Sequence, residues 1–136
     1  MRALGFVSIG ITLLALANCG SSTDCKSGET CACDGIGACT WNCPGGDCTY
    51  ETSGTGAASL TCDGGGCSLD ASGTGAVNLD CEGGGCTGSS SGSGALSVTC
   101  AGNDCAFECS GTGSCSLNEC DTGCTLDCVG ITAVCE

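Results

Sequence analysis

Cysteine pairs five positions apart are the residues of this chain best suited to chemistry. They flank glycine-rich segments, as in TCDGGGC at 61–67 and DCEGGGC at 80–86. Such pairs could ligate a soft metal, act as a redox couple or close a turn as a disulfide. Metal sites are usually built from C-x2-C pairs or from cysteine with histidine, whereas this chain has no C-x-x-C and no histidine. Redox pairs need a positive neighbour that lowers a thiol pKa, and the neighbours here are Asp63 and Glu82.

A disulfide that locks a glycine turn is the interpretation that the spacing favours. Cysteines on both sides of a short turn can reach the Cα separation of ~4.4–6.8 Å that a bridge requires. Pairing near neighbours predicts nine bridges: Cys25–Cys31, Cys33–Cys39, Cys43–Cys48, Cys62–Cys67, Cys81–Cys86, Cys100–Cys105, Cys109–Cys115, Cys120–Cys124 and Cys128–Cys135. Bridges between neighbouring repeats are the alternative, but each column of equivalent cysteines holds five members, an odd number.

The cysteines follow a repeat of nineteen residues. They recur at positions 43, 62, 81 and 100, while SGTG at 53–56 returns at 72–75 and 110–113. Six registers run from Asp34 to Glu136, with a one-residue slip at Cys120. A fixed period of this length is typical of a solenoid.

Each repeat contains two short segments in which apolar and polar residues alternate, such as SLDA at 68–71 and AVNLDC at 76–81. Such alternation predicts strands with one buried face, and glycine-rich corners allow the positive φ angles of tight turns. We therefore predict an all-β fold, a disulfide-braced β-solenoid with about nineteen residues and two short strands per coil. An antiparallel meander is the alternative. It would leave its apolar face in water, whereas a coil buries that face between two sheets.

Stacked repeats place four carboxylates at one outward position. These are Glu51, Asp70, Glu108 and Asp127, with Ser89 interrupting the column. Carboxylate oxygens are ligands for Ca²⁺ and other hard cations, so a metal site on these four residues is one hypothesis. A solvated acidic face that keeps a stacked β-protein soluble is the simpler interpretation.

Composition excludes several classes of function. The chain has 136 residues, with 15 acidic side chains against two basic ones. Arg2 and Lys26 cannot neutralise a row of phosphates, so nucleic-acid binding and a polybasic membrane patch are excluded. Because histidine is absent and the carboxylates follow the repeat, we expect no catalytic activity and no cofactor. Trp41 and Tyr50 could stack on a sugar, but a cap over the end of the core is the expected role.

The first nineteen residues have the features of an export signal. Arg2 is followed by an apolar run from Leu4 to Ala17, which is typical of a signal peptide and short for a membrane span of ~20 residues. The segment 15–17 (Ala-Leu-Ala) would suit ordinary signal peptidase. The segment 16–19 (Leu-Ala-Asn-Cys) resembles the lipobox of bacterial lipoproteins, in which the cysteine becomes the lipidated first residue. Asn18 stands where that family usually has Gly, Ala or Ser.

Cysteine parity favours lipidation of Cys19. The chain has 19 cysteines, and removal of Cys19 leaves an even set for nine bridges. We predict a signal peptide at 1–18, a lipidated cysteine, short tether and Cys-rich cap at 19–33, and six solenoid repeats at 34–136. A cysteine content above the ~8–10% of disulfide scaffolds requires an oxidising compartment.

The repeat region is similar in style to disulfide-braced β-solenoids such as the insect antifreeze proteins that carry one disulfide per coil. Those proteins have a regular Thr-x-Thr face. The outward pairs here are Ser59/Thr61, Asn78/Asp80 and Ser97/Thr99, so ice binding is not implied.

These observations predict a lipid-anchored, extracytoplasmic protein with a structural or surface-interaction role at the outer membrane or cell surface. Secretion or a periplasmic location is the alternative. A surface protein that binds divalent cations or soft metals, and a carbohydrate-binding or adhesive module, are two further hypotheses. The expected partners are the membrane, through the lipid anchor, and a cell-surface or glycan partner. The uncapped last coil also predicts end-to-end self-association.

Overall fold

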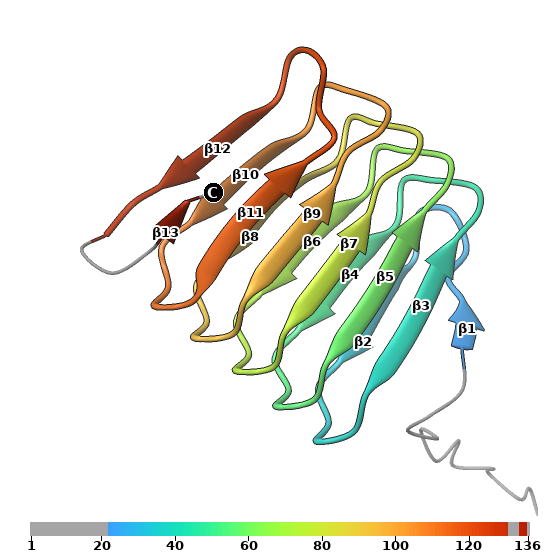
Figure 1. Cartoon of the computed structure of the whole chain (residues 1–136). Coiled ribbons are helices and arrows are strands. Elements are labelled where there is room, and N and C mark those ends of the chain that lie inside the picture. The colour runs from blue at the N-terminus through green and yellow to red at the C-terminus, as the bar shows by residue number, and fades with distance from the viewer. Residues whose placement is uncertain (1–21, 131–133, 136) are drawn as a thin grey trace, which may run out of the picture.

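The computed structural model of this chain describes residues 22–130 and 134–135. Strands and tight turns make up this part, and it contains no helix that could cross a membrane. The strands are β1 (Ser22–Asp24), β2 (Thr30–Cys33), β3 (Cys39–Cys43), β4 (Thr49–Thr52), β5 (Ala58–Cys62), β6 (Ser68–Ala71), β7 (Val77–Asp80), β8 (Thr87–Ser90), β9 (Leu96–Thr99), β10 (Ala106–Cys109), β11 (Ser114–Asn118), β12 (Thr125–Cys128) and β13 (Val134–Cys135). Figure 1 shows them stacked as successive coils, from β1 at one end to β12 and β13 at the other.

The strands form two parallel sheets. The odd-numbered sheet has the order β1-β3-β5-β7-β9-β11-β13, and the even-numbered sheet has the order β12-β10-β8-β6-β4-β2. Every described strand pair is parallel. Each coil therefore adds one strand to each sheet, which confirms the predicted β-solenoid and excludes the antiparallel meander.

Neighbouring coils are in register at nineteen residues over most of the stack. In the even-numbered sheet, for example, Tyr50 lies beside Leu69. The register is eighteen residues between β1 and β3 and twenty residues between β11 and β13. In its described part, the segment predicted as a cap at 19–33 contributes β1 and β2 to the two sheets. The solenoid therefore begins before Asp34.

The core lies between the two sheets and contains the inward side chains that the alternation predicted. Those that are buried come from both sheets: Tyr50, Leu69 and Phe107 from the even-numbered one, and Leu60, Leu79 and Val98 from the odd-numbered one. Each side chain of this kind stabilises the fold by about 1.5–3 kcal/mol. The core is less well covered toward the last coil, where Leu117 and Leu126 are only partly buried.

One inward position of the core holds a glycine. Gly88 lies between Leu69 and Phe107 in the register of β6, β8 and β10. A Cβ at residue 88 would lie 2.9 Å from the ring atom Cε1 of Phe107 and 2.6 Å from the carbonyl oxygen of Leu69. The absent side chain therefore leaves the space that the Phe107 ring occupies.

Candidate functional site

Eight disulfides lie within single coils, at eight of the nine predicted pairs. They join Cys25–Cys31, Cys33–Cys39, Cys43–Cys48, Cys62–Cys67, Cys81–Cys86, Cys100–Cys105, Cys109–Cys115 and Cys120–Cys124. Their Cα–Cα distances run from 6.2 to 6.6 Å. These cysteines therefore do not link neighbouring coils. Such a disulfide content is that of an extracytoplasmic protein.

Two of the predicted cysteine roles involve side chains that the structure does not describe. Cys19, the predicted lipidation site, precedes it. Cys128 is disulfide-bonded, but the side chain of its predicted partner, Cys135, is not described. The structure thus bears on eight of the nine predicted bridges.

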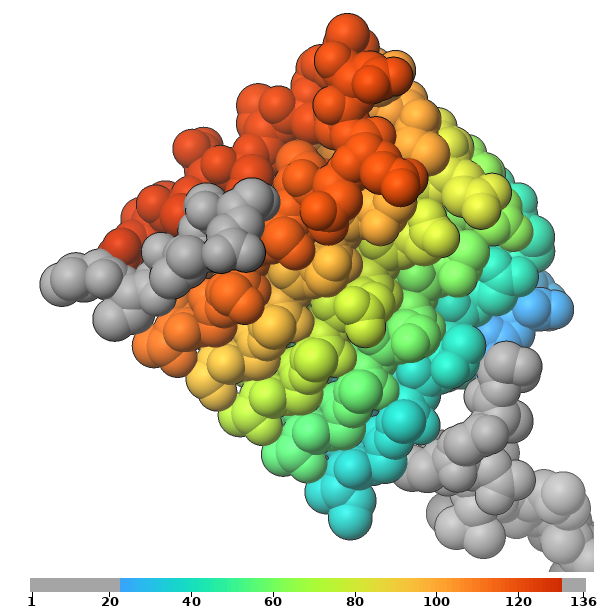
Figure 2. Space-filling model, in the orientation of Figure 1, coloured from blue at the N-terminus to red at the C-terminus, as the bar shows by residue number. Residues whose placement is uncertain are grey.

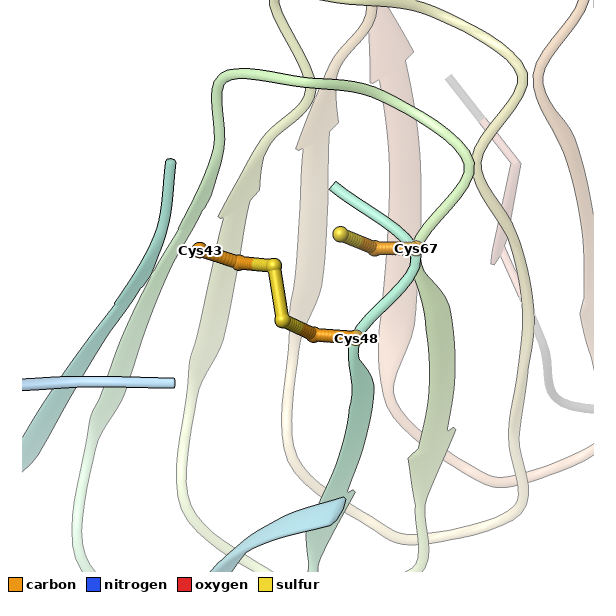
Figure 3. Close-up of side chains that lie close together, drawn as sticks. All are labelled: Cys43, Cys48 and Cys67. Carbon is orange, nitrogen blue, oxygen red and sulfur yellow. A yellow bond between two sulfur atoms is a disulfide. The ribbon is translucent and has the colours of Figure 1, made fainter. Parts of the chain in front are cut away.

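Five bridges stack into a column of sulfur at one corner of the coils. We call this corner, at 43–48, 62–67, 81–86, 100–105 and 120–124, the cysteine corner. The sulfur atoms of Cys43, Cys48 and Cys67 lie within 4.8 Å of one another, and Figure 3 shows Cys67 beside the Cys43–Cys48 bridge. Thiolates, not disulfides, bind soft metals. Soft-metal binding would therefore require reduction of this column.

Left-handed backbone conformations shape the cysteine corner. Gly66 has φ = 69°, and Asp47 and Asp104 occupy the equivalent position with φ = 56° and 55°. Aspartate and asparagine tolerate this region better than most residues do. Next to Asp104, the side-chain oxygen of Asn103 accepts hydrogen bonds from two backbone N–H groups, those of residues 121 and 122, at 3.2 Å each. These bonds hold the corner of the last coil, where the repeat slips by one residue.

The carboxylates predicted to form a column do stand in one register. Glu51 lies beside Asp70, and Glu108 lies beside Asp127, with Ser89 between the two pairs. All four acidic side chains are exposed. Among the described residues, the groups of three or more potential ligands close enough to share one metal ion consist of cysteines alone. The carboxylates are thus aligned in pairs but do not form a compact ligand cage.

Small polar side chains cover the outer face of the odd-numbered sheet. This hydroxyl face consists of Thr40, Asn42, Ser59, Thr61, Asn78, Asp80, Ser97, Thr99, Ser116 and Asn118. Figure 2 shows this side of the molecule as parallel rows of side chains, one row from each coil. Within the rows, the hydroxyl of Ser116 lies 3.4 Å from that of Ser97, within hydrogen-bonding distance. The face presents hydroxyl and amide groups in regular columns, with one carboxylate among them, Asp80.

Tyr50 is a buried core residue and does not stack on a ligand. Its side chain is fully buried, and its hydroxyl donates a hydrogen bond to the carbonyl oxygen of Thr61 at 2.7 Å. Burial, with a smaller contribution from the charge of Asp63, raises the pKa of Tyr50 to about 12. Trp41 is half-buried against the core. Tyr50 therefore cannot form a sugar-stacking pair with Trp41. It lies inside the stack, between Cys31 and Leu69, so it does not cap the end of the core as the sequence predicted.

Sequence reasoning missed the first coil of the solenoid, which β1 and β2 form. Residues 30–35 (TCACDG) align with 49–54 (TYETSG), and the structure pairs the two segments in that register. This similarity was a usable signal. It was hidden because the preceding corner is one residue shorter than the others, so cysteine spacing alone does not reveal it.

In comparisons with protein-family models, with curated proteins and with solved structures, nothing matches this chain. Its function must therefore be inferred from the faces, corners and ends of the solenoid.

Proposed function

We propose that this chain is a non-catalytic, extracytoplasmic protein with a structural or surface-interaction role. The observation that carries this proposal is the hydroxyl face, which is regular and is braced by disulfides at every described coil. Strands in a sheet lie about 4.8 Å apart, so equivalent hydroxyl and amide groups recur at that spacing. Such columns suit an extended polymer that itself repeats hydroxyl groups. The proposed partner is therefore a cell-surface glycan.

A second candidate function is divalent-cation binding at the acidic column. It is favoured by the pairs Glu51–Asp70 and Glu108–Asp127, which neighbouring strands place side by side. The segment from β4 to β12 has no lysine or arginine to offset their charge. A Ca²⁺ ion at either pair would need further oxygen ligands from backbone or water.

We further propose that Cys19 carries a lipid that holds the protein at the outer membrane or cell surface. Eight bridges and the bonded Cys128 account for all but two cysteines of the chain. The nine-bridge scheme assigns one of these, Cys135, to Cys128. Cys19 then remains for modification. Intact mass, measured before and after reduction and alkylation, should show eighteen labels only after reduction and a diacyl or triacyl adduct on Cys19.

Glycan binding is tested on an array of cell-surface polysaccharides, with and without a chelator. The variant Ser59→Arg/Asn78→Arg places two large cations on the hydroxyl face, and Ser68→Arg/Thr87→Arg makes the same change at exposed positions of the opposite face. We expect the first variant to lose at least tenfold in retention and the second to bind like the wild type. Equal losses in both variants would contradict the assignment of the hydroxyl face.

The same array separates the two candidate functions. Binding through the hydroxyl face should be insensitive to the chelator. Cation binding would appear instead as Ca²⁺ uptake in isothermal titration calorimetry, and Glu51→Gln/Asp70→Asn should abolish the contribution of that pair. Absence of Ca²⁺ uptake by the wild-type protein would exclude the second candidate.

A further inference from the structure

Within 22–130 and 134–135, no strand pairs with the outer edges of β1, β2, β12 and β13, so the described solenoid ends in open sheet edges. β1 and β2 form one end, and β12 with β13 form the other (Figure 1). Open edges present backbone N–H and C=O groups that can pair with a further strand. Four features of these ends point to the same occupant.

The first feature is that β13 and β1 cover complementary parts of equivalent strands, one at each end of the solenoid. β13 covers the first two residues of β11, and 116–118 have no described strand on that side. β1 covers Thr40–Asn42 of β3. The register through β5, β7 and β9 makes those positions equivalent to 116–118. β1 of a second copy would therefore supply, beside β13, the part of the strand that β11 lacks.

The second feature is the matching backbone of β12 and β2. Thr125 donates its N–H to the carbonyl oxygen of Cys105, just before β10. Alternation along a parallel strand then turns the N–H of Leu126 toward the open side. Thr49 donates its N–H to Glu29, and the same alternation turns the C=O of Thr30 toward the open side of β2. Stacking β2 of a second copy on β12 would bring this donor and acceptor together in the existing register.

The third feature is the difference in charge between the two ends. In β2, Ala32 holds the position of the acidic column, so Asp127 of one copy would lie beside an uncharged residue of the next. At the cysteine-corner side, the first coil carries Lys26 between the exposed Asp24 and Glu29, and the last coil carries Glu119 and Asp121. The joint would thus avoid carboxylate repulsion along the column of Glu51, Asp70, Glu108 and Asp127, and it would bring the one lysine near Glu119 and Asp121.

The fourth feature is exposed apolar surface at both ends. Among the described residues, the large apolar side chains that stand exposed are Ile36, at 90%, and Val129, at 57%. Ile36 lies in the first coil and Val129 in the last, at the corner opposite the cysteine corner. Contact between a last coil and a first coil would bring the two near each other and remove apolar area from water.

We propose that the protein assembles head to tail with copies of itself, the last coil of one copy pairing with the first coil of the next. Both sheets continue across the joint, with Asp127 beside Ala32. Because the two ends differ, the contact is heterologous, and repeated addition gives an open filament instead of a closed dimer. This assembly requires neither a glycan nor a lipid, so it stands apart from the proposed function.

Zero-length carbodiimide cross-linking tests the direction of assembly, because Lys26 is the only lysine of the chain. The oxidised full-length protein is studied in non-ionic detergent, so that an N-terminal anchor does not itself cause association. We expect a concentration-dependent cross-link between Lys26 and Glu119 or Asp121. Several coils separate these residues in one chain, so their cross-link reports two copies. Monomers at the highest concentration, or intermolecular links from Lys26 only to residues of the first coil, would overturn the proposal.

A matched pair of variants tests the joint itself by sedimentation velocity. Ala32→Asp places a carboxylate at the first coil, where it would face Asp127 of the preceding copy. Ser89→Asp places one in the same column in mid-stack, between Asp70 and Glu108. Opposed like charges cost up to about 1 kcal/mol. We therefore expect Ala32→Asp to raise the midpoint concentration of assembly about fivefold and Ser89→Asp to leave it unchanged. An equal shift in both variants would overturn the proposal.

Discussion

The two corners of each coil hold the chain by different means. The cysteine corner carries a bridge at each of its five positions, and in the middle coils its cysteines are wholly buried. The glycine corner, at 34–37, 53–56, 72–75, 91–94 and 110–113, is bridged in the described part at Cys33–Cys39 and Cys109–Cys115. Small or aliphatic residues flank it in the coils between.

Backbone contact holds neighbouring coils together at the glycine corner. A Cβ at Gly75 would overlap the carbonyl oxygen of Gly56 in the preceding coil. The N–H of Thr74 donates to the carbonyl oxygen of Gly54 at 3.1 Å. The coils pack backbone on backbone at both corners, because a Cβ at Gly64 in the cysteine corner would also meet the backbone of Gly45 and Gly46 at 2.5 Å. The cysteine corner differs in the buried sulfur that it adds. The cysteine corner also turns through left-handed residues such as Gly66, whereas the glycine corner contains none at the five positions given above.

Removal of a central bridge should have the largest effect. In Cys81→Ala/Cys86→Ala we expect the free energy of unfolding to fall by about 4 kcal/mol. About 2 kcal/mol comes from lost loop closure, and about 2 kcal/mol comes from the cavity that the buried sulfur atoms leave. Urea denaturation measures the change. Cys33→Ala/Cys39→Ala at the glycine corner removes a half-buried bridge, and its loss should be nearer 2 kcal/mol. Equal losses would contradict the distinction between the corners.

Adding a single methyl group at the glycine corner should cause the next largest loss of stability. Gly75→Ala must displace the backbone of the preceding coil, and we expect a loss of about 3 kcal/mol. Gly45→Ala in the cysteine corner is the control, because its Cβ would meet the Cβ of Ser27 at 3.3 Å and no closer atom. Thermal unfolding should show a change within about 0.5 kcal/mol for this variant. Similar stability of the two variants would show that the coils do not need backbone contact.

The buried hydroxyl of Tyr50, on the cysteine-corner side, predicts that the free energy of unfolding depends on pH. The pKa of Tyr50 is raised to about 12, while a tyrosine in the unfolded chain titrates near 10. The neutral phenol therefore stabilises the fold fully below about pH 10, and this stabilisation is lost as the pH rises toward about 12. We expect a loss on the order of 2 kcal/mol across this window in the wild type. Tyr50→Phe should not show it, so parallel stability profiles of the two proteins would exclude this origin.

Removing the buried hydroxyl of Thr52, on the glycine-corner side, should have the smallest effect on stability, and this effect should be a gain. Thr52 is 4% exposed, and its Oγ1 has no hydrogen-bond partner. Thr52→Val keeps the shape and removes the unpaired group, so we expect a gain of about 1 kcal/mol in the free energy of unfolding. The exposed Thr87→Val serves as the control and should change stability by less than about 0.5 kcal/mol. A loss of stability in Thr52→Val would show that its hydroxyl is paired in solution.

The period and the alternation were sufficient to predict the coils, the two sheets and the inward side chains such as Leu60 and Leu69. Local spacing was also sufficient for the eight described bridges, because a glycine turn restricts which cysteines can meet. The first coil was not predicted as such, since its corner is one residue short of the repeat. Gly88 looks like a defect in a strand when read alone, and its role depends on Phe107 in the next coil. Contacts between coils, unlike contacts within them, require the stacked structure.

The alignment of the acidic column also followed from the repeat, whereas its chemistry did not. Register places Glu51 beside Asp70, but the number of oxygen ligands around either pair depends on side-chain geometry that periodicity does not encode. The same limit applies to Tyr50. Its place in an inward column was predictable, and the hydrogen bond to Thr61 that accompanies its burial was not.

The short span of every described bridge has a consequence for the order of folding. No described bridge joins cysteines more than six residues apart, so each can form before the following coil has left the export machinery. Loops of this length close in well under a microsecond, and oxidation is then the slower event. Each finished coil offers a template edge to the next. The chain can thus be built in the direction of its synthesis, and the length of the stack adds little to the difficulty of folding.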